Sequence, residues 1–313
     1  MRGTFIKTLM EVARENENVF LLTADLGFKL FDEFRHDFPD RFINVGVAEQ
    51  NMVGIGAGLS LSGKNVYCYS MIPFLILRAL EFIRVDLCYQ NLNVKLIGVG
   101  GGLTYGLEGM THHAIEDIAI ARALPNLSVV APGDPVEARG IIRESANYPG
   151  PLYVRLGGNN DPVVHKDGQE VSIGKGIVIQ EGEGITLFCT GGTLPAAKAS
   201  LEILGKERSI RPTLISLHTI KPLDTRLVSM HAKRSHAVFT VEEHSVIGGL
   251  GSAVGETLLE QGYKGLFCRI GLPDQYSPVV GRSSYLKQVC GLTAEGIAER
   301  IMNGLKRVDE ERI

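Results

Sequence analysis

The chain alternates short runs of β-branched and aromatic residues with longer segments of helical periodicity. The helical segments lie at roughly 51 to 62, 76 to 90, 114 to 123 and 134 to 147. The runs around them are NVFLLTAD, RFINVGV, NVYCYS, NVKLIGVG, LSVVAP and LYVRLG. This alternation is typical of βαβ units, in which helices cover both faces of a mostly parallel sheet. The sequence therefore predicts an α/β fold.

A second series of the same kind follows residue 172. Its strand-like runs are GIVIQEG, ITLFCTG, RPTLISLHTI, AVFTVEE and GLFCRIG, with helical segments near 193 to 205, 223 to 232, 250 to 262 and 293 to 305. The stretch between the two series, NNDPVVHKDGQEVS, has no periodicity and many turn formers. Because 313 residues suffice for two cores, we predict domains at 1–158 and 173–313 joined by a linker at 159–172.

Composition excludes several classes of protein. A net charge of −3 and 44% hydrophobic residues indicate neither a nucleic-acid groove nor an acidic tail. The most apolar window, MIPFLILRAL, is interrupted by Arg78 and is far shorter than the ~20 residues of a membrane span. The amphipathic start of the chain is unlike a signal peptide. Five cysteines, odd in number and without a CxxC pair, are typical of a reducing compartment. We expect a soluble cytoplasmic protein whose partner is a small molecule or another protein.

The common motifs of α/β enzymes are missing from the sequence. The glycine-rich turns GVGGGL, GIGAGL and GGLGSAV lack the Gly or Ala that a dinucleotide fingerprint needs at its last position. No Walker loop, G-x-S-x-G elbow or HExxH helix occurs. Function must therefore be inferred from other residues.

Glu49 is the most informative single residue. It lies in INVGVAEQNMVGIGAGLSLSG, where a strand-like run turns into a helix rich in small residues. Open α/β sheets bind their ligands at the carboxyl ends of strands, and burial there would suit a carboxyl group that exchanges a proton near neutrality. An acid in the first turn of a helix can also simply stabilise the helix dipole. The spacing alone leaves both interpretations open.

Several segments resemble the transketolase family of thiamine diphosphate enzymes. FINVGVAEQNMVGIGAGLSLSG resembles the aminopyrimidine-binding motif of that family. LLTADLG, GLEGMTHHAIEDIAIARALPNLSVVAPGD and TVEEHSVIGGLGSAV resemble further family motifs, in family order. The resemblance spans nearly the whole chain and is strongest to split enzymes, in which this polypeptide is the second of two subunits. It implies a pyrimidine-binding thiamin fold followed by a transketolase C-terminal-like domain.

The resemblance implies which residues contact thiamine diphosphate. Glu49 would hydrogen-bond N1′ of the pyrimidine ring, which allows the cofactor's own 4′-imino group to act as the base. Phe74 would stack on that ring, and Met71 stands where many relatives have a second aromatic residue. Asp25 and Leu26 match the cofactor-proximal ADL sequence of the family.

The resemblance also implies substrate contacts. His112 matches the histidine that faces the substrate near the reactive carbon, and Arg2 matches another family arginine. Glu108 replaces the aspartate that usually contacts an acceptor hydroxyl. A metal site at His112 and His113 is not predicted, because neighbouring residues on a helix point about 100° apart.

Two departures from the family pattern concern the cofactor and the substrate. The chain contains no GDG motif, so the diphosphate and its Mg²⁺ are expected on an amino-terminal partner subunit, in an α₂β₂ assembly. Gly100 and Gly158 stand where relatives often have a substrate-binding histidine and a phosphate-binding arginine. The identities of the donor and the acceptor, and whether the donor is decarboxylated, therefore stay open.

The leading interpretation is a transferase subunit that moves a two-carbon ketol unit from a ketose to an aldehyde acceptor. An alternative is a subunit like deoxyxylulose-phosphate synthase or another carboligase that decarboxylates a 2-oxo acid. A third possibility is a non-catalytic assembly subunit, against which the retention of Glu49, Phe74 and His112 argues. At the end of a later strand, Glu242, Glu243 and His244 are interpreted as a structural subunit contact rather than a catalytic group.

Overall fold

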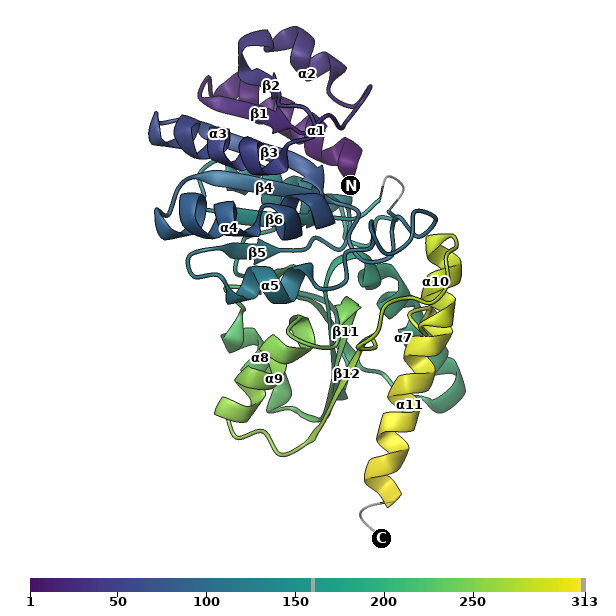
Figure 1. Cartoon of the computed structure of the whole chain (residues 1–313). Helices are drawn as coiled ribbons and strands as arrows, with labels where there is room; N and C mark the ends of the chain where they lie inside the picture. The colour runs from purple at the N-terminus through teal and green to yellow at the C-terminus, as the bar shows by residue number, and fades with distance from the viewer. Residues whose placement is uncertain (159–160, 311–313) are drawn as a thin grey trace.

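The computed structural model describes residues 1–158 and 161–310, and it contains two sheets that follow one another along the molecule (Figure 1). The first sheet has the order β10-β5-β6-β4-β3-β1-β2 and is parallel except for β10. Its strands are β1 (Val19–Thr23), β2 (Phe42–Asn44), β3 (Asn65–Met71), β4 (Val94–Val99), β5 (Ser128–Val130), β6 (Leu152–Leu156) and β10 (Thr219–Lys221).

The second sheet has the order β12-β11-β8-β9-β7, and only β7 is antiparallel to its neighbour. Its strands are β7 (Ile177–Gln180), β8 (Gly184–Cys189), β9 (Thr213–Ser216), β11 (Ser235–Ser245) and β12 (Leu266–Leu272). Two mostly parallel sheets flanked by helices confirm the predicted fold class. Residues 159 and 160 of the predicted linker lie outside the described residues, and the domain boundaries stay our proposed division of the chain.

Helices cover both faces of the first sheet, because its buried strands present apolar side chains on each side. One face carries α3 (Glu49–Leu61), the π-helical η2 (Pro73–Arg78), α4 (Leu80–Phe82), the π-helical η3 (Ile83–Tyr89) and α5 (Asp117–Ala123), as Figure 1 shows for the α-helices. The other face carries α1 (Arg2–Glu15) and α6 (Pro135–Ser145), with α2 (Asp32–Asp37) and the short η1 (Pro39–Arg41) near the sheet's end.

The second sheet is likewise covered on both faces. One face carries α8 (Thr225–Ala232) and α9 (Leu250–Glu260). The other carries α7 (Leu194–Arg208) and α11 (Ala294–Glu310), and the short η4 (Gly191–Thr193) and α10 (Ser283–Val289) complete the domain. Sequence periodicity missed α2 and α10, because these helices have six and seven residues and each buries one side chain, Phe34 and Leu286. Within the described residues, no helix is long and apolar enough to cross a membrane.

The two domains are joined by more than a linker. The run 211–220, predicted as one strand, divides after Ser216: β9 pairs with β8, and β10 then pairs with β5 of the first sheet. The turn is fixed where the backbone N–H of Leu217 donates to Cys189 and the N–H of Ala131 donates to His218, at 2.8 and 2.7 Å. Apolar residues of both sheets, among them Val129 and Phe188, belong to one buried cluster. The position of each domain relative to the other is therefore fixed by packing.

His165 anchors the described part of the predicted linker to the first domain. Its Nδ1 lies 3.0 Å from Asp134 Oδ2 and its Nε2 lies 3.2 Å from Glu137 Oε1, and all three side chains are buried. Burial favours the neutral ring, but the ion pairs with Asp134 and Glu137 outweigh burial and raise the pKa of His165 to about 9. The backbone N–H groups of Val164 and His165 also donate to Asp134.

We expect His165→Gln to lower the free energy of unfolding more at pH 6 than at pH 10. A histidine whose pKa rises from ~6.5 on folding stabilises the protein fully below that pH and loses the contribution as the pH passes its folded value. The difference should be about 2 to 3 kcal/mol, measured by urea unfolding at both pH values. His236→Gln, at an exposed histidine, is the matched control. Equal destabilisation by His165→Gln at both pH values would contradict the ion-pair assignment.

Candidate active site

The residues singled out from the sequence gather along one edge of the first sheet. Asp25 and Leu26 follow β1, and Glu49 begins α3 shortly after β2. Phe74 lies in η2 just beyond β3, and Gly100 directly follows β4. Because these strands are parallel neighbours in the sheet, all of their carboxyl ends meet at this edge. This is the edge at which open α/β sheets bind ligands.

Glu49 is buried at the amino end of α3, with 1% of its surface exposed. Ser70 Oγ donates to Glu49 Oε1 over 3.1 Å, and Arg78 Nη1 donates to Oε2 over 2.7 Å. The Arg78 guanidinium also lies over the Phe74 ring, with its Cζ 4.6 Å from the ring centroid. Two donors do not saturate a carboxylate, which can accept about four hydrogen bonds. Glu49 therefore keeps lone pairs for a ligand.

Sequence reasoning missed Ser70 and Arg78 as neighbours of Glu49. Arg78 attracted notice only as a charge that interrupts an apolar window. Phe74 and Arg78 are four residues apart in the π-helical η2, so both side chains lie on one face of it, and π-helical turns are frequent at functional sites. A lone arginine four residues after the stacking aromatic residue was the available signal.

His112 faces Phe74 across this edge. The two ring centroids are 5.2 Å apart with planes at 77°, and the centroid of the Tyr105 ring lies 6.4 Å from that of His112 with planes at 79°. His112 Nδ1 lies 2.9 Å from Thr111 Oγ1, and Nε2 has no hydrogen-bond partner among the described residues. The assumption that His112 and His113 lie on a helix was wrong, because His112 lies in a turn, His113 in an irregular segment, and α5 begins only at Asp117. No group of three or more His, Cys, Asp or Glu in the described chain could hold a metal ion.

Arg2 reaches the same edge from the first turn of α1. Its Nε donates to the Tyr69 hydroxyl over 3.0 Å, while its terminal nitrogens make no hydrogen bond to a described residue. Burial opposes the charge on Arg2, but the phenols of Tyr69 and Tyr105 outweigh it and raise the pKa of the guanidinium. The amino group of Met1 holds this end of the chain through Asp161, 2.9 Å away. Arg2 is therefore a half-buried cation with free donors, within electrostatic reach of Tyr105.

Asp25 and Leu26 line a cleft of about 350 Å³ at the end of β1. Asp25 has a positive φ of 55°, and Asn44 holds this conformation: its Oδ1 accepts from the Asp25 N–H over 2.9 Å, and its Nδ2 donates to Asp25 Oδ1 over 3.2 Å. Sequence reasoning missed Asn44. Met71 is half-buried and packs against the core beneath the sheet edge.

The Glu108 side chain makes no contact of its own with His112 or Phe74 by hydrogen bond or ion pair. It is exposed, and its carboxylate forms no hydrogen bond or ion pair within the described part of the chain. Its backbone N–H donates to Tyr105 across a turn, at 3.1 Å. The predicted contact between Glu108 and an acceptor hydroxyl therefore stays a prediction.

A buried ion pair positions the loop that carries His112. Arg155 Nε donates to Asp117 over 2.8 Å, and its Nη2 donates to the backbone oxygens of Ala114 and Glu243 over 2.8 and 3.0 Å. Glu243 in turn accepts from the Leu103 N–H over 2.8 Å. These contacts connect both ends of the loop to the second domain.

Glu242, Glu243 and His244 of β11 have structural roles within the chain, and the subunit contact that we expected of them stays a prediction. Glu242 accepts from the N–H groups of Leu250 and Gly251 at the start of α9, over 2.7 and 2.8 Å. Burial raises the pKa of Glu242 to about 7 in spite of these hydrogen bonds. His244 Nε2 accepts from the Ala119 N–H over 3.3 Å.

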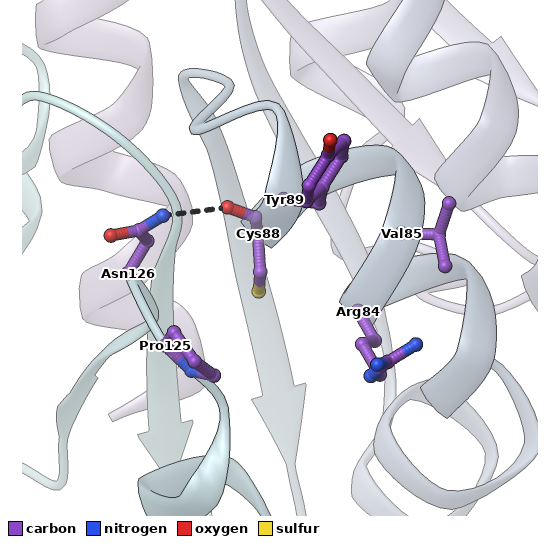
Figure 2. A pocket seen from close by; sticks show the side chains of 6 residues that line it. All are labelled: Arg84, Val85, Cys88, Tyr89, Pro125 and Asn126. Atoms are coloured by element: carbon purple, nitrogen blue, oxygen red, sulfur yellow. Dashed lines mark hydrogen bonds between the residues drawn. The ribbon is translucent and has the colours of Figure 1, made fainter.

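A second cavity, of about 430 Å³, lies at the opposite edge of the first sheet (Figure 2). It is lined by Arg84, Val85, Cys88, Tyr89, Pro125 and Asn126. Asn126 Nδ2 donates to the Cys88 carbonyl over 2.9 Å. Burial raises the pKa of the Cys88 thiol to about 11, so the sulfur stays protonated and is a poor nucleophile. The cavity adds nothing to the chemistry around Glu49.

Two domain profiles match this architecture. The profile described as "Transketolase, pyrimidine binding domain" matches residues 1–161, and the one described as "Transketolase, C-terminal domain" matches residues 174–297. The chain belongs to the transketolase family. Thiamine diphosphate dependence is implied by that family, and a buried carboxylate next to a half-exposed aromatic ring fits an aminopyrimidine.

Known transketolase sequences align along nearly the whole chain. A "Putative transketolase C-terminal section" of Methanocaldococcus jannaschii is 40% identical over 310 residues, 98% of this chain and 96% of the relative. One of the subunits of an apulose-4-phosphate transketolase from Phocaeicola vulgatus is 36% identical over 309 residues, 98% and 97% of the two chains. A "1-deoxy-D-xylulose-5-phosphate synthase 1" of Geobacter sulfurreducens is 35% identical over 303 residues, but these cover only 46% of that protein.

A solved structure agrees with the sequence comparison. The protein described as "Split gene transketolase, inactive beta4 tetramer" superposes with a TM-score of 0.90 at 36% identity, covering 97% of this chain and 98% of that one. The transketolase relatives and this structure are similar to the chain over its full length. The predicted resemblance to the second subunit of a split transketolase is confirmed.

Proposed function

We propose that the chain is the second subunit of a thiamine diphosphate-dependent transketolase, which transfers a two-carbon ketol unit from a ketose to an aldehyde acceptor. The observation that carries this proposal is the buried Glu49 carboxylate beside Phe74, with the imidazole of His112 against the same ring. These three side chains come from separate segments of the chain, and packing brings them to one sheet edge.

The bound cofactor supplies the nucleophilic carbon and, through its own amino group, the base that generates it. Glu49 would hold N1′ of the pyrimidine by a hydrogen bond, with Ser70 and Arg78 fixing the carboxylate's orientation. Phe74 would stack on the ring, and Asp25, Leu26 and Met71 would complete the surroundings. His112, whose Nε2 is available, would donate a hydrogen bond to the substrate oxygen on which charge develops.

The rest of the cofactor site would come from a partner. The chain has no GDG motif, and a diphosphate needs a divalent ion and oriented donors. We infer that the diphosphate and the Mg²⁺ are held by an amino-terminal subunit, in an α₂β₂ complex. The related structure described as an inactive β4 tetramer supports the view that the second subunit lacks activity on its own.

Arg2 supports a substrate with an anionic end. Its terminal nitrogens are available at the edge that carries His112, and guanidinium groups bind phosphate through paired hydrogen bonds. The name of the Phocaeicola vulgatus relative refers to a sugar phosphate. Gly100 and Gly158 provide no side chain, so Arg2 would be a principal contact for that end of the sugar.

We expect the chain to bind thiamine diphosphate with Mg²⁺, and to produce sugar from hydroxypyruvate and an aldose phosphate, only after it is combined with the amino-terminal subunit. Calorimetric titration and product analysis test this. Carbon dioxide release from pyruvate by the complex would favour the synthase-like alternative, which the similarity to the Geobacter sulfurreducens protein supports. A complex that binds no cofactor would favour a non-catalytic assembly subunit.

A further inference from the structure

The backbone at Gly100 leaves a place that the ring of Tyr105 fills. Gly100 has a φ of +89°, which L side chains rarely adopt. A Cβ built on Gly100 would lie 2.2 Å from Cε2 and 2.4 Å from Cδ2 of Tyr105. A side chain at position 100 and the tyrosine ring therefore exclude one another. The glycine and the tyrosine form a complementary pair within one loop.

Tyr105 is close to two residues of the proposed substrate site, His112 and Arg2. Its ring packs edge-on near the His112 imidazole, with the centroids 6.4 Å apart. Burial raises the pKa of the Tyr105 phenol. The Arg2 cation lowers this pKa and the Glu108 carboxylate raises it further, so Arg2 and Glu108 both lie within electrostatic reach of the phenol. The Tyr105 hydroxyl forms no hydrogen bond to any residue that the structure describes. A half-buried phenol without a hydrogen-bond partner is thus available near His112 and Arg2.

The loop that carries Tyr105 is held at several points. Gly102 and Ala114 exchange backbone hydrogen bonds of 2.9 and 3.0 Å, and Thr104 Oγ1 donates to the Gly101 carbonyl over 2.6 Å. Gly106, the residue after Tyr105, accepts through its carbonyl oxygen from the Gly281 N–H of the second domain over 3.3 Å. The ring is therefore part of a fixed wall, as a specificity-determining group must be.

We propose that Tyr105 is a specificity-determining residue of the transketolase site. Its ring occupies the place of the side chain that Gly100 lacks, and its hydroxyl binds the part of a sugar chain that extends from the reacting carbons toward Arg2. This inference rests on the proposed function. The substrates that use Tyr105 are aldoses long enough to reach the phenol and carrying an anionic end group, whereas a two-carbon aldehyde does not reach it.

The test uses the complex of the chain with its amino-terminal subunit, thiamine diphosphate and Mg²⁺, with hydroxypyruvate as donor. The kcat/KM values for D-ribose 5-phosphate and for glycolaldehyde are compared in wild type, Tyr105→Phe and Tyr105→Ala. Loss of one hydrogen bond to a bound polar group should lower kcat/KM for ribose 5-phosphate about 10-fold, mainly through KM, and leave glycolaldehyde within about 2-fold. Tyr89→Phe, at a tyrosine that is 85% exposed at the opposite sheet edge, is the matched control.

The outcomes separate the two proposals. An active wild-type complex in which Tyr105→Phe leaves the ratio of the two acceptors unchanged would overturn the role of Tyr105 and leave the proposed function intact. An equal loss for both acceptors would also overturn it, because a merely structural role would not distinguish a long acceptor from a short one. A wild-type complex inactive with both acceptors would overturn the proposed function and the inference that rests on it.

Discussion

Replacing Glu49 with Gln should lower kcat of the reconstituted complex by about 10²- to 10⁴-fold, the range that a positioned acid or base contributes. Glutamine keeps the shape of the side chain but removes the negative charge that holds N1′. The carboxylate is buried and already fixed by Ser70 and Arg78, so solvent cannot replace it. Steady-state kinetics with hydroxypyruvate and an aldose phosphate measures the effect.

Glu81→Gln provides the matched control, because Glu81 is exposed in α4 close to the same run of helices. It should leave kcat unchanged. Glu49→Gln should also leave assembly with the partner and the cooperativity of unfolding intact, since Arg78 is 41% exposed and water can solvate it when its partner is lost. A Glu49→Gln complex with wild-type kcat would remove Glu49 from the mechanism.

Asp117→Asn is expected to have the largest effect on stability. Asp117 is 1% exposed and accepts from Arg155 and from the Tyr153 hydroxyl, over 2.8 and 2.6 Å. The neutral amide leaves the Arg155 guanidinium, itself 4% exposed, without the carboxylate with which it is paired. Breaking one partner of a buried ion pair typically costs about 3 to 5 kcal/mol. Urea unfolding at pH 7 measures the loss.

The control for this substitution is Asp37→Asn, which breaks an exposed pair with Arg14 and should change stability little. The unfolding curves of the two variants are compared with wild type at the same protein concentration. If Asp117→Asn destabilised the chain no more than Asp37→Asn, the Arg155 ion pair would not hold the His112 loop.

The architecture could be predicted because its determinants are local. The runs NVYCYS and NVKLIGVG are rich in apolar residues, and they form most of the strands β3 and β4, which are buried except for the half-buried Met71. Glu49 stood out for the same reason, as one acid between a strand-like run and a helix of small residues. Family motifs then placed Phe74, His112 and Arg2, and the structure brings their segments to one edge.

What could not be predicted depends on contacts between distant residues or on unusual backbone conformation. Arg155 and Asp117 are 38 residues apart in the chain, so no local sequence pattern predicts their ion pair. The overlap of Tyr105 with the space above Gly100 requires the positive φ of that glycine. Arg78 meets Glu49 across 29 residues, a distance along the chain at which no periodic pattern connects them.

The most direct measurement is a crystal structure of this chain with its amino-terminal subunit, thiamine diphosphate and Mg²⁺. We expect N1′ of the aminopyrimidine to lie within hydrogen-bonding distance of the Glu49 carboxylate, Phe74 to stack on the ring, and the diphosphate to be bound by the partner. A pyrimidine ring bound elsewhere, or a Glu49 side chain turned away from it toward solvent, would contradict the role of Glu49 on which the proposed function depends.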